Sequence, residues 1–255
     1  ANVATGYHAI EFLLWGQDLN GTDAGAGARP YTDFVQGEGC THDNCDRRAA
    51  YLQAATDLLV TDLKEMVANW AEGGAARTAI EADPKAGISA ILTGMGSLSY
   101  GELAGERIKL GLMLHDPEEE HDCFSDMTHL SHYYDGVGIR NVYTGSYTRV
   151  DGTVVSGPSI SDLVKAADPA VDAQLRSELD ASVGALGEMK AAAEGGMAFD
   201  QMLAMGNEEG AAIITKAVDA LVTQTRSIER AVAALGGEIE VEGSDSLDNP
   251  NAVFQ

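Results

Sequence analysis

The sequence has few basic residues. It carries 16 lysines and arginines against 40 aspartates and glutamates, which gives a formal net charge of -24. Phosphate backbones and anionic membrane surfaces repel such a chain, so we expect no nucleic-acid partner. The sequence also lacks an apolar run long enough to cross a bilayer, which favours a soluble protein. Cations and basic molecules remain as the partners that suit an acidic surface.

Cysteine is scarce too, with three in 255 residues. Cys40 and Cys45 bracket the polar stretch GCTHDNCD, where a small disulfide ring is expected if the protein is exported. His42 lies between them, and a metal-binding knuckle is the alternative. We favour the disulfide because a structural zinc site normally takes four ligands and this stretch offers three. Cys123 is then left as an unpaired thiol.

Apolar residues recur at helical spacing along most of the chain, which predicts an all-α protein of helical bundles. In the stretch from Arg47 to Trp70, we expect Met66 and Trp70 to pack in the core. Frequent glycines predict a tight approach between helices, or a break or kink near residues 97–101. The expected helices cover residues 3–16, 47–70 and 84–114, a stretch opened by Pro169, and two pieces within 199–235.

One β-hairpin is expected among the helices. Residues around Asp151-Gly152 alternate between β-branched or aromatic and polar types, which predicts a hairpin-containing insertion at about 136–158. The acidic tail, residues 237–255, has few bulky side chains, and we expect it to be extended or disordered. The chain is thus divided into a helical region, 1–236, and a tail.

The stretch GYHAIEFLLWGQD, residues 6–18, places a histidine and a glutamate three positions apart in apolar surroundings. On a helix, His8 and Glu11 share one face, at a spacing that suits either metal ligation or a simple hydrogen bond. Di-iron carboxylate proteins pair a carboxylate and a histidine in this way, opposite other carboxylates. A buried Glu11 needs a cation, an arginine or a proton to compensate its charge.

Further ligands are expected from the polar segment HDPEEEHDCFSDMTHLSHYYD, residues 115–135. Asp126 and His129 repeat the three-residue spacing there, and we predict them as metal co-ligands. The acidic run 118–120 is expected to form a solvated loop. Oxygen and imidazole donors together suit a divalent or ferric ion, iron or zinc.

Glu102 and Glu106 fall on one helix face with Arg107 beside them. We predict that these three side chains line the metal pocket and set its charge; alternatively, Arg107 is simply the ion-pair partner of Glu11 or Glu106. Peptidase motifs are missing, because H-E-x-x-H needs a glutamate where Ala9 stands and H-x-x-E-H needs a histidine where Phe12 stands.

The stretch GYHAIEFLLWGQD resembles the G-x-H-x-x-E signature of the imelysin-like proteins, a bacterial family of periplasmic or outer-membrane-associated proteins named after an insulin-cleaving metallopeptidase. The resemblance continues in order through SYGELAGERI, EEEHDCFSDMTH and NVYTGSYTRVDGTVVSGPSISDLV, so it covers most of the chain to about Leu235. It implies an all-α fold of two helical-bundle domains with the signature near their interface. His8 and Glu11 match the histidine and the glutamate of the signature.

The resemblance also implies a function. It indicates an exported protein that binds iron, another metal or a metal-containing ligand in an acidic interdomain cleft, for iron acquisition, with other cell-envelope iron-uptake proteins as partners. A metallopeptidase with a His-x-x-Glu metal site is the alternative. Family members normally carry a helical region before the signature, whereas five residues precede Gly6 here. We expect that region either to have been removed or to associate as a separate chain.

Overall fold

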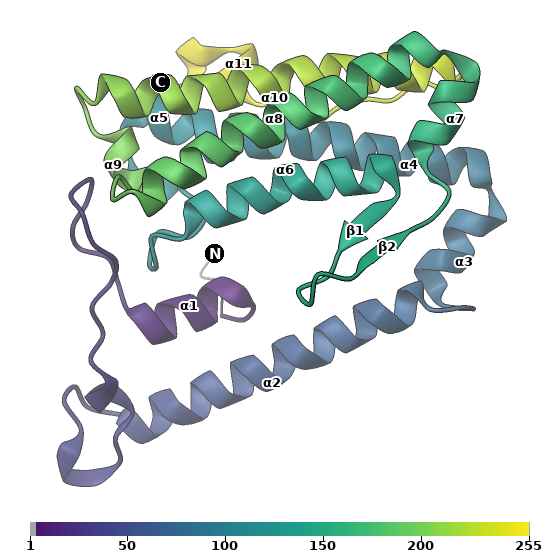
Figure 1. Ribbon diagram of the computed structural model, residues 1–255. Coiled ribbons are helices and arrows are strands. Elements are labelled where there is room, and N and C mark those ends of the chain that lie inside the picture. Colours follow the sequence, from purple (N-terminus) through teal and green to yellow (C-terminus); the bar gives the residue numbers. More distant parts are fainter. Residues whose placement is uncertain (1–3, 255) are drawn as a thin grey trace.

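The computed structural model describes residues 4–254. These residues form helices and one two-stranded hairpin, which confirms the all-α prediction (Figure 1). Among the described helices, none combines the length and the hydropathy that a bilayer crossing requires. The opening helix begins at Tyr7, and the first residue predicted for it, Val3, lies outside the described residues.

Four long helical elements form the bundle in the upper half of Figure 1. α8 packs against α6 and α10, while η3 packs against α6 and α10 from the other side. Buried apolar side chains from all four elements fill the core between them. The elements are α6 (Thr128–Thr144), α8 (Pro169–Glu194), α10 (Glu208–Ala234), and the continuous helix made of α4 (Pro84–Ser97), η3 (Leu98–Lys109) and α5 (Leu110–Leu114).

Shorter elements connect and flank the bundle. In the hairpin, Tyr147 lies opposite Val155 in antiparallel register. The hairpin occupies less than the predicted insertion, because residues 136–144 still belong to α6. The shorter elements are η1 (Tyr31–Phe34), η2 (Gly37–Gly39), α3 (Ala75–Ala82), η4 (Pro117–Glu119), β1 (Ser146–Thr148), β2 (Val154–Ser156), α7 (Ile160–Ala167), α9 (Phe199–Leu203), α11 (Asp245–Asp248) and η5 (Pro250–Phe254).

The segment η3 is π-helical, and it begins where a kink was predicted. The chain does not break there; it continues as a helix with a wider turn. Glycines in η3 allow the tail to approach closely. A Cβ atom on Gly101 would lie 2.6 Å from the Glu242 carbonyl oxygen, and one on Gly105 would lie 2.3 Å from Ser244 Cβ. These glycines therefore serve tail packing.

The tail packs along η3 without regular secondary structure before it turns into α11. The Tyr100 hydroxyl donates to Asp248 Oδ1 at 2.6 Å. Ser246 Oγ donates to the Gly105 carbonyl oxygen at 2.9 Å, and both Ser244 and Ser246 are buried. The tail is thus part of the packed structure.

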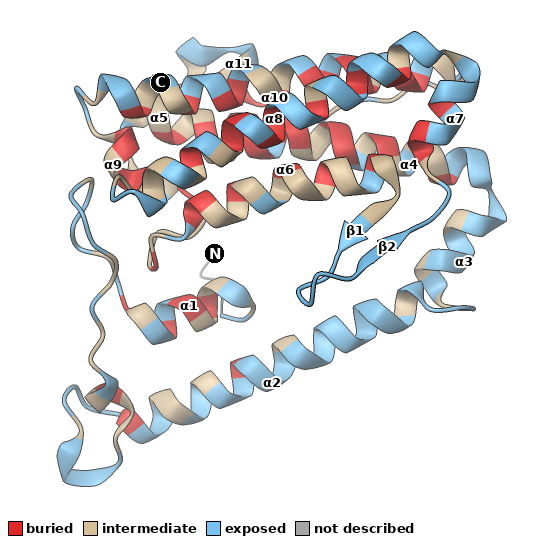
Figure 2. Cartoon of the chain, viewed as in Figure 1, coloured by how far each residue is buried: buried red, intermediate tan, exposed pale blue. Residues whose placement is uncertain are grey.

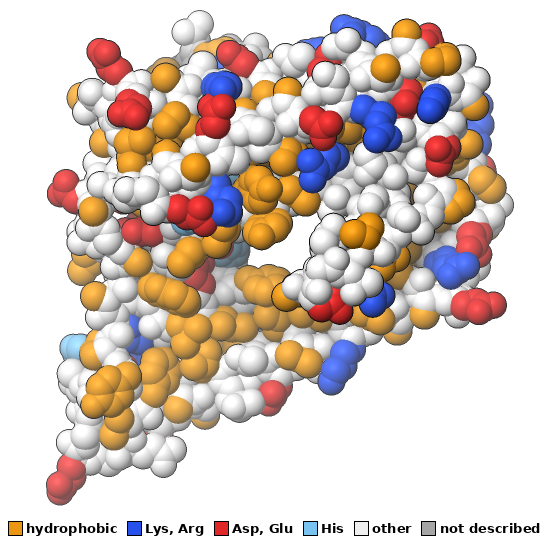
Figure 3. Space-filling view, viewed as in Figure 1, with side chains coloured by type: hydrophobic (Ala, Val, Ile, Leu, Met, Phe, Trp, Pro, Cys, Tyr) orange, Lys and Arg blue, Asp and Glu red, His pale blue; other side chains and the backbone are white. Residues whose placement is uncertain are grey.

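The helix α2 (Cys45–Trp70) lies apart from the bundle. It contacts α1 (Tyr7–Trp15), η1 and α3, and Figure 2 shows most of its surface exposed. The prediction that Met66 and Trp70 pack in the core was wrong, since they are 60% and 54% exposed. In Figure 3, apolar side chains gather along α2 beside an opening that the hairpin and the bundle border. Helical periodicity identifies an apolar face but not what covers it.

Candidate metal centre

The helix α1 presents the His-x-x-Glu pair. Glycines bound it on both sides, with positive φ angles at Gly6 and Gly16 that side-chain-bearing residues rarely adopt. The helix buries Ala9, Glu11 and Leu13, and Glu11 accepts a hydrogen bond from the Ser125 backbone N–H in the loop that precedes α6. Its phenylalanine Phe12 packs edge-on against Phe124 of that loop, with 5.1 Å between ring centroids. This contact holds the loop over the pair.

Three side chains meet at this position. His8 Nδ1 lies 3.0 Å from Glu11 Oε2 and 3.5 Å from Asp122 Oδ1. One potential ligand atom from each residue lies within 4.8 Å of the other two. The side chain of His8 is 42% exposed, whereas those of Glu11 and Asp122 are 9% and 16% exposed. The group is therefore open to solvent on the histidine side and enclosed on the carboxylate side.

Serine hydroxyls orient both carboxylates. Glu11 Oε1 accepts hydrogen bonds from the Ser125 backbone N–H at 2.9 Å and from Ser125 Oγ at 2.7 Å. The Ser131 hydroxyl donates to Asp122 Oδ2. These hydrogen bonds hold one oxygen of each carboxylate. The other oxygens, Glu11 Oε2 and Asp122 Oδ1, face His8. Outer partners of this kind are typical of metal sites, where they fix the orientation of the ligands.

The electrostatics of the pair suit a cation. The hydrogen bond to Glu11 raises the pKa of His8 despite some burial, and the charge of Asp122 adds to the increase. Burial by itself would raise the pKa of Glu11, but the hydrogen bonds from His8 and Ser125 outweigh it and lower the pKa. A proton on His8 thus balances the carboxylates, and a metal ion bound here would take its place.

Two further histidines continue inward from His8. The ring of His121 lies 5.5 Å from that of His8 and 6.0 Å from that of His132. His132 is completely buried, burial lowers its pKa, and neither of its ring nitrogens has a hydrogen-bond partner among the described residues. His121 Nδ1 lies 3.9 Å from Asp135 Oδ2. The imidazoles of His121 and His132 therefore lie on the inner side of the proposed ligands. The sequence patterns did not indicate His132 or Asp135.

The two predicted co-ligands lie elsewhere. Asp126 precedes α6, has a φ of 55°, and groups with Asp18 and Asp200. His129 lies in the first turn of α6, and its Nδ1 is buried without a hydrogen-bond partner in the described part of the chain. Since α6 begins only at Thr128, the three-residue spacing does not place both side chains on one helix face. Asp122, which sequence reasoning missed, joins His8 and Glu11 instead.

The three residues of η3 that were predicted to line the metal pocket have different partners. Arg107 Nε donates to Glu102 Oε1 at 2.8 Å, across the five-residue spacing of a π-helical turn. The positive charge of Arg107 acts on both His8 and His132, so this residue borders the site. Glu106 instead accepts from Ser244 Oγ at 2.6 Å. Arg107 therefore does not serve as the ion-pair partner of Glu11 or Glu106.

The acidic run 118–120 is not wholly solvated, in contrast to the prediction. Glu120 is 5% exposed, and neither of its carboxylate oxygens has a hydrogen-bond partner in the described residues. Burial raises the pKa of Glu120 to about 8, and the charges of Asp200 and Asp126 contribute to the increase. Burial also raises the pKa of Asp200 to about 7.

The cysteine loop does not form a metal knuckle in the structure. Cys40 and Cys45 are joined by a disulfide, and Cys123 is free. His42 Nδ1 lies 2.7 Å from Asp33 Oδ1, so the histidine between the cysteines pairs with a buried carboxylate. The cysteine loop is therefore not a metal site of the knuckle type. The His8 group offers the imidazole and carboxylate donors that the sequence predicted.

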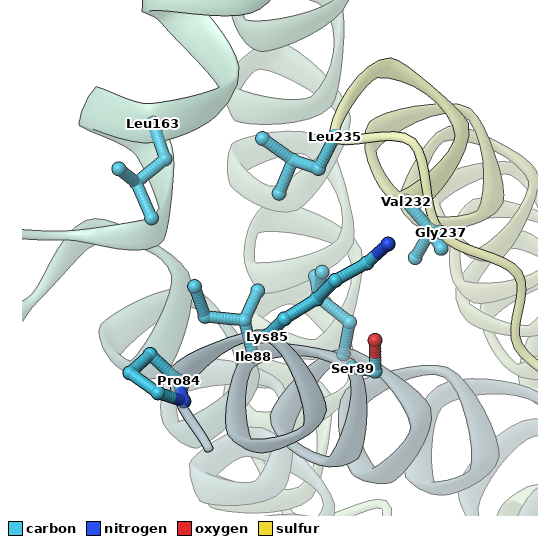
Figure 4. Close-up of a pocket in the computed structure, with 9 residues that line it drawn as sticks. Pro84, Lys85, Ile88, Ser89, Leu163, Val232, Leu235 and Gly237 are labelled. Atoms are coloured by element: carbon cyan, nitrogen blue, oxygen red, sulfur yellow. The ribbon is translucent and has the colours of Figure 1, made fainter. Parts of the chain in front are cut away.

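A pocket of about 300 Å³ lies at the other end of the bundle, between α4, α7 and the end of α10 (Figure 4). Its lining is mainly apolar, with Ile88, Leu92, Leu163 and Leu235 among its residues, and includes one charged side chain, Lys85. Among the residues that the structure describes, no carboxylate or imidazole lines it. It therefore lacks the donor set of a metal site.

The structure thus describes an all-α protein whose opening helix offers a histidine and a glutamate, next to an aspartate, as a candidate metal centre. The chain belongs to the imelysin family, described as Peptidase_M75, which matches residues 1–228. Membership places it, at the level of the family, among metallopeptidase-like or iron-related proteins. No curated protein matches the sequence.

Proposed function

We propose that this chain binds iron or zinc, or a ligand that contains such a metal, through His8, Glu11 and Asp122, and that it serves iron acquisition. The observation that carries this proposal is the convergence of one imidazole and two carboxylates within 4.8 Å. Ser125 and Ser131 hold the two carboxylates in place.

The donor set supports iron or zinc. Imidazole nitrogen combined with carboxylate oxygen suits these ions, whereas soft thiolate sites would need cysteines. Two carboxylates match the charge of a divalent ion. Three protein ligands leave coordination positions open on the exposed side of His8, where water or a donor atom of a metal-containing ligand would bind.

We further propose that the protein acts in the bacterial cell envelope, in the periplasm or at the outer membrane. The Cys40–Cys45 disulfide supports an oxidising compartment, since such bonds are rare in the cytosol. Other iron-uptake proteins of the envelope are the partners that this role requires.

A metallopeptidase is the second candidate. Its support is that three protein ligands would leave a coordination position free on a bound ion, and catalytic zinc sites use such a position to activate water. The site lacks the glutamate that follows the first histidine in H-E-x-x-H, because Ala9 stands there. The carrier role therefore fits the residues better than hydrolysis.

We expect one metal ion to bind per chain at the His8 group. The metal-free protein would be titrated calorimetrically with ferrous ion under anaerobic conditions, with chelated ferric ion, and with zinc. A peptide-cleavage assay on the loaded protein would then separate the candidates, since a carrier leaves the peptide intact. A folded protein that binds none of these ions at this group would contradict both.

The affinity for the metal is expected to depend on pH. Because the pKa of His8 is raised, a larger share of this side chain is protonated at neutral pH than in an ordinary histidine, and the ion must displace the proton. Below the pKa of His8, the affinity should fall by about tenfold per pH unit, and above it the dependence should flatten. Titrations between pH 5.5 and 8.5 in buffers of equal ionic strength would measure this. An affinity independent of pH would show that His8 is not a ligand.

A further inference from the structure

A second group of carboxylates lies near the first. Asp18, Asp126 and Asp200 each place an oxygen within 4.8 Å of the other two. They come from three distant parts of the chain: the turn after α1, the loop before α6, and the first turn of α9. None of them belongs to the His8 group. The fold therefore brings together three carboxyl groups that repel one another when all three are ionised.

Buried oxygens without partners point into this group. Asp200 is 1% exposed, and neither of its carboxylate oxygens has a hydrogen-bond partner among the described residues. Asp126 Oδ1 is buried and equally unpartnered. Glu120, also buried and unpartnered, lies close enough for the charges of Asp200, Asp126 and Asp18 to act on it. Burying polar groups without partners is costly; a proton or a bound cation can compensate a buried carboxylate, and a cation would also give these oxygens the partners that they lack.

We propose that Asp18, Asp126 and Asp200 form a second cation site, which binds calcium, with Glu120 at its inner side. The site goes beyond the proposed function, because it shares no ligand with the His8 group. Its donors are carboxylate oxygens, without imidazole or thiolate, and calcium prefers such hard donors. Water completes the coordination on the side of Asp18, which is partly exposed.

The ion at this site holds α1 to the bundle. Among the helices, α1 packs mainly against α2, and the loop before α6 links it to the bundle through the contacts of Glu11 and Phe12. The second site adds a link between Asp18, in the turn after α1, and α9, whose residues Phe199 and Met202 are buried in the core. Calcium therefore stabilises the position of the helix that carries the His-x-x-Glu pair.

The experiment is a calorimetric titration of the metal-free protein with calcium chloride, beside thermal unfolding with and without calcium. We expect one calcium ion per chain and, at a hundredfold excess over the dissociation constant, a rise of about 5 °C or more in the midpoint. Asp200→Asn and Asp18→Asn should each weaken calcium binding by at least about tenfold. Asp18 lies on a partly exposed turn, so its variant tests the site even if the Asp200 variant fails to fold.

Glu11→Gln is the matched control, because it removes one carboxylate from the first group and should leave calcium binding unchanged. Conversely, Asp18→Asn should retain zinc binding at the His8 group, so that failure of one site is distinguishable from failure of the other. The proposal is overturned if the folded wild type binds no calcium, or if Glu11→Gln abolishes calcium binding while Asp18→Asn does not.

Discussion

Replacing Glu11 with glutamine is expected to weaken metal binding by about 100-fold or more. The substitution keeps the shape of the side chain and its contact with Ser125, but it removes the charge that faces His8 at 3.0 Å. Changes to outer partners of metal ligands already cost about 10- to 100-fold in affinity, so the loss of a direct ligand should reach or exceed the upper end of this range. His8→Ala should have an effect of the same size. Calorimetric titration with zinc and ferrous ion would measure both.

Two further variants make this test specific. Ser125→Ala removes the hydroxyl that donates to Glu11 Oε1 at 2.7 Å, and we expect about a tenfold loss, as for an outer partner. His129→Ala removes a residue that sequence spacing predicts as a ligand but that does not join His8 in the structure, and it should leave the affinity unchanged. Circular dichroism would establish that each variant is folded. A large loss in His129→Ala together with unchanged binding in Glu11→Gln would place the metal elsewhere.

Gly105→Val is expected to lower the free energy of unfolding by about 3 kcal/mol, at the upper end of the usual cost of overpacking. A Cβ atom at this position would overlap with Ser244, and the branched side chain adds two more carbons. The tail would have to move off η3, which breaks the hydrogen bonds from Ser246 to Gly105 and from Ser244 to Glu106. Urea unfolding would measure the loss.

Gly94→Ala provides the control for this prediction. Gly94 is in α4 of the same continuous helix, but a Cβ atom there would contact nothing within 4 Å. Alanine should therefore raise the free energy of unfolding by up to about 1 kcal/mol through helix propensity. Limited proteolysis should cut the tail faster in Gly105→Val than in the wild type or Gly94→Ala. Equal stability and equal cleavage of all three proteins would show that the tail does not depend on close packing at Gly105.

Helix positions were predictable from the sequence because their signals are local. Pro169 opens α8, and α9 and α10 are the two pieces expected within 199–235. The hairpin forms around Asp151-Gly152, although it is shorter than the predicted insertion. The π-helical geometry of η3 was not predictable as such, since the glycines indicated a tight approach between helices, a break or a kink, but not a wider helical turn. These glycines allow close packing of the tail, which lies more than 130 residues further along the chain. The hydrogen bond from Ser246 Oγ to the Gly105 carbonyl oxygen is one such contact.

The candidate site was predictable in part for the same reason. His8 and Glu11 are three residues apart on one helix, so their proximity follows from helix geometry alone. Asp122 belongs to an irregular loop, where spacing carries no information about direction. The same spacing rule failed for Asp126 and His129, because the helix starts between them. No periodic pattern could have brought Asp18 and Asp200 together.

The sequence by itself determined the helical fold, the hairpin turn and the His-x-x-Glu pair, because each depends on interactions between residues close in the chain. Only the tertiary structure decided that α2 lies apart from the core, that Asp122 completes the first group, and that Asp18, Asp126 and Asp200 form the second. These features depend on how separate elements pack. A pattern within one element indicates which face is apolar or charged, but not which face of another element it meets.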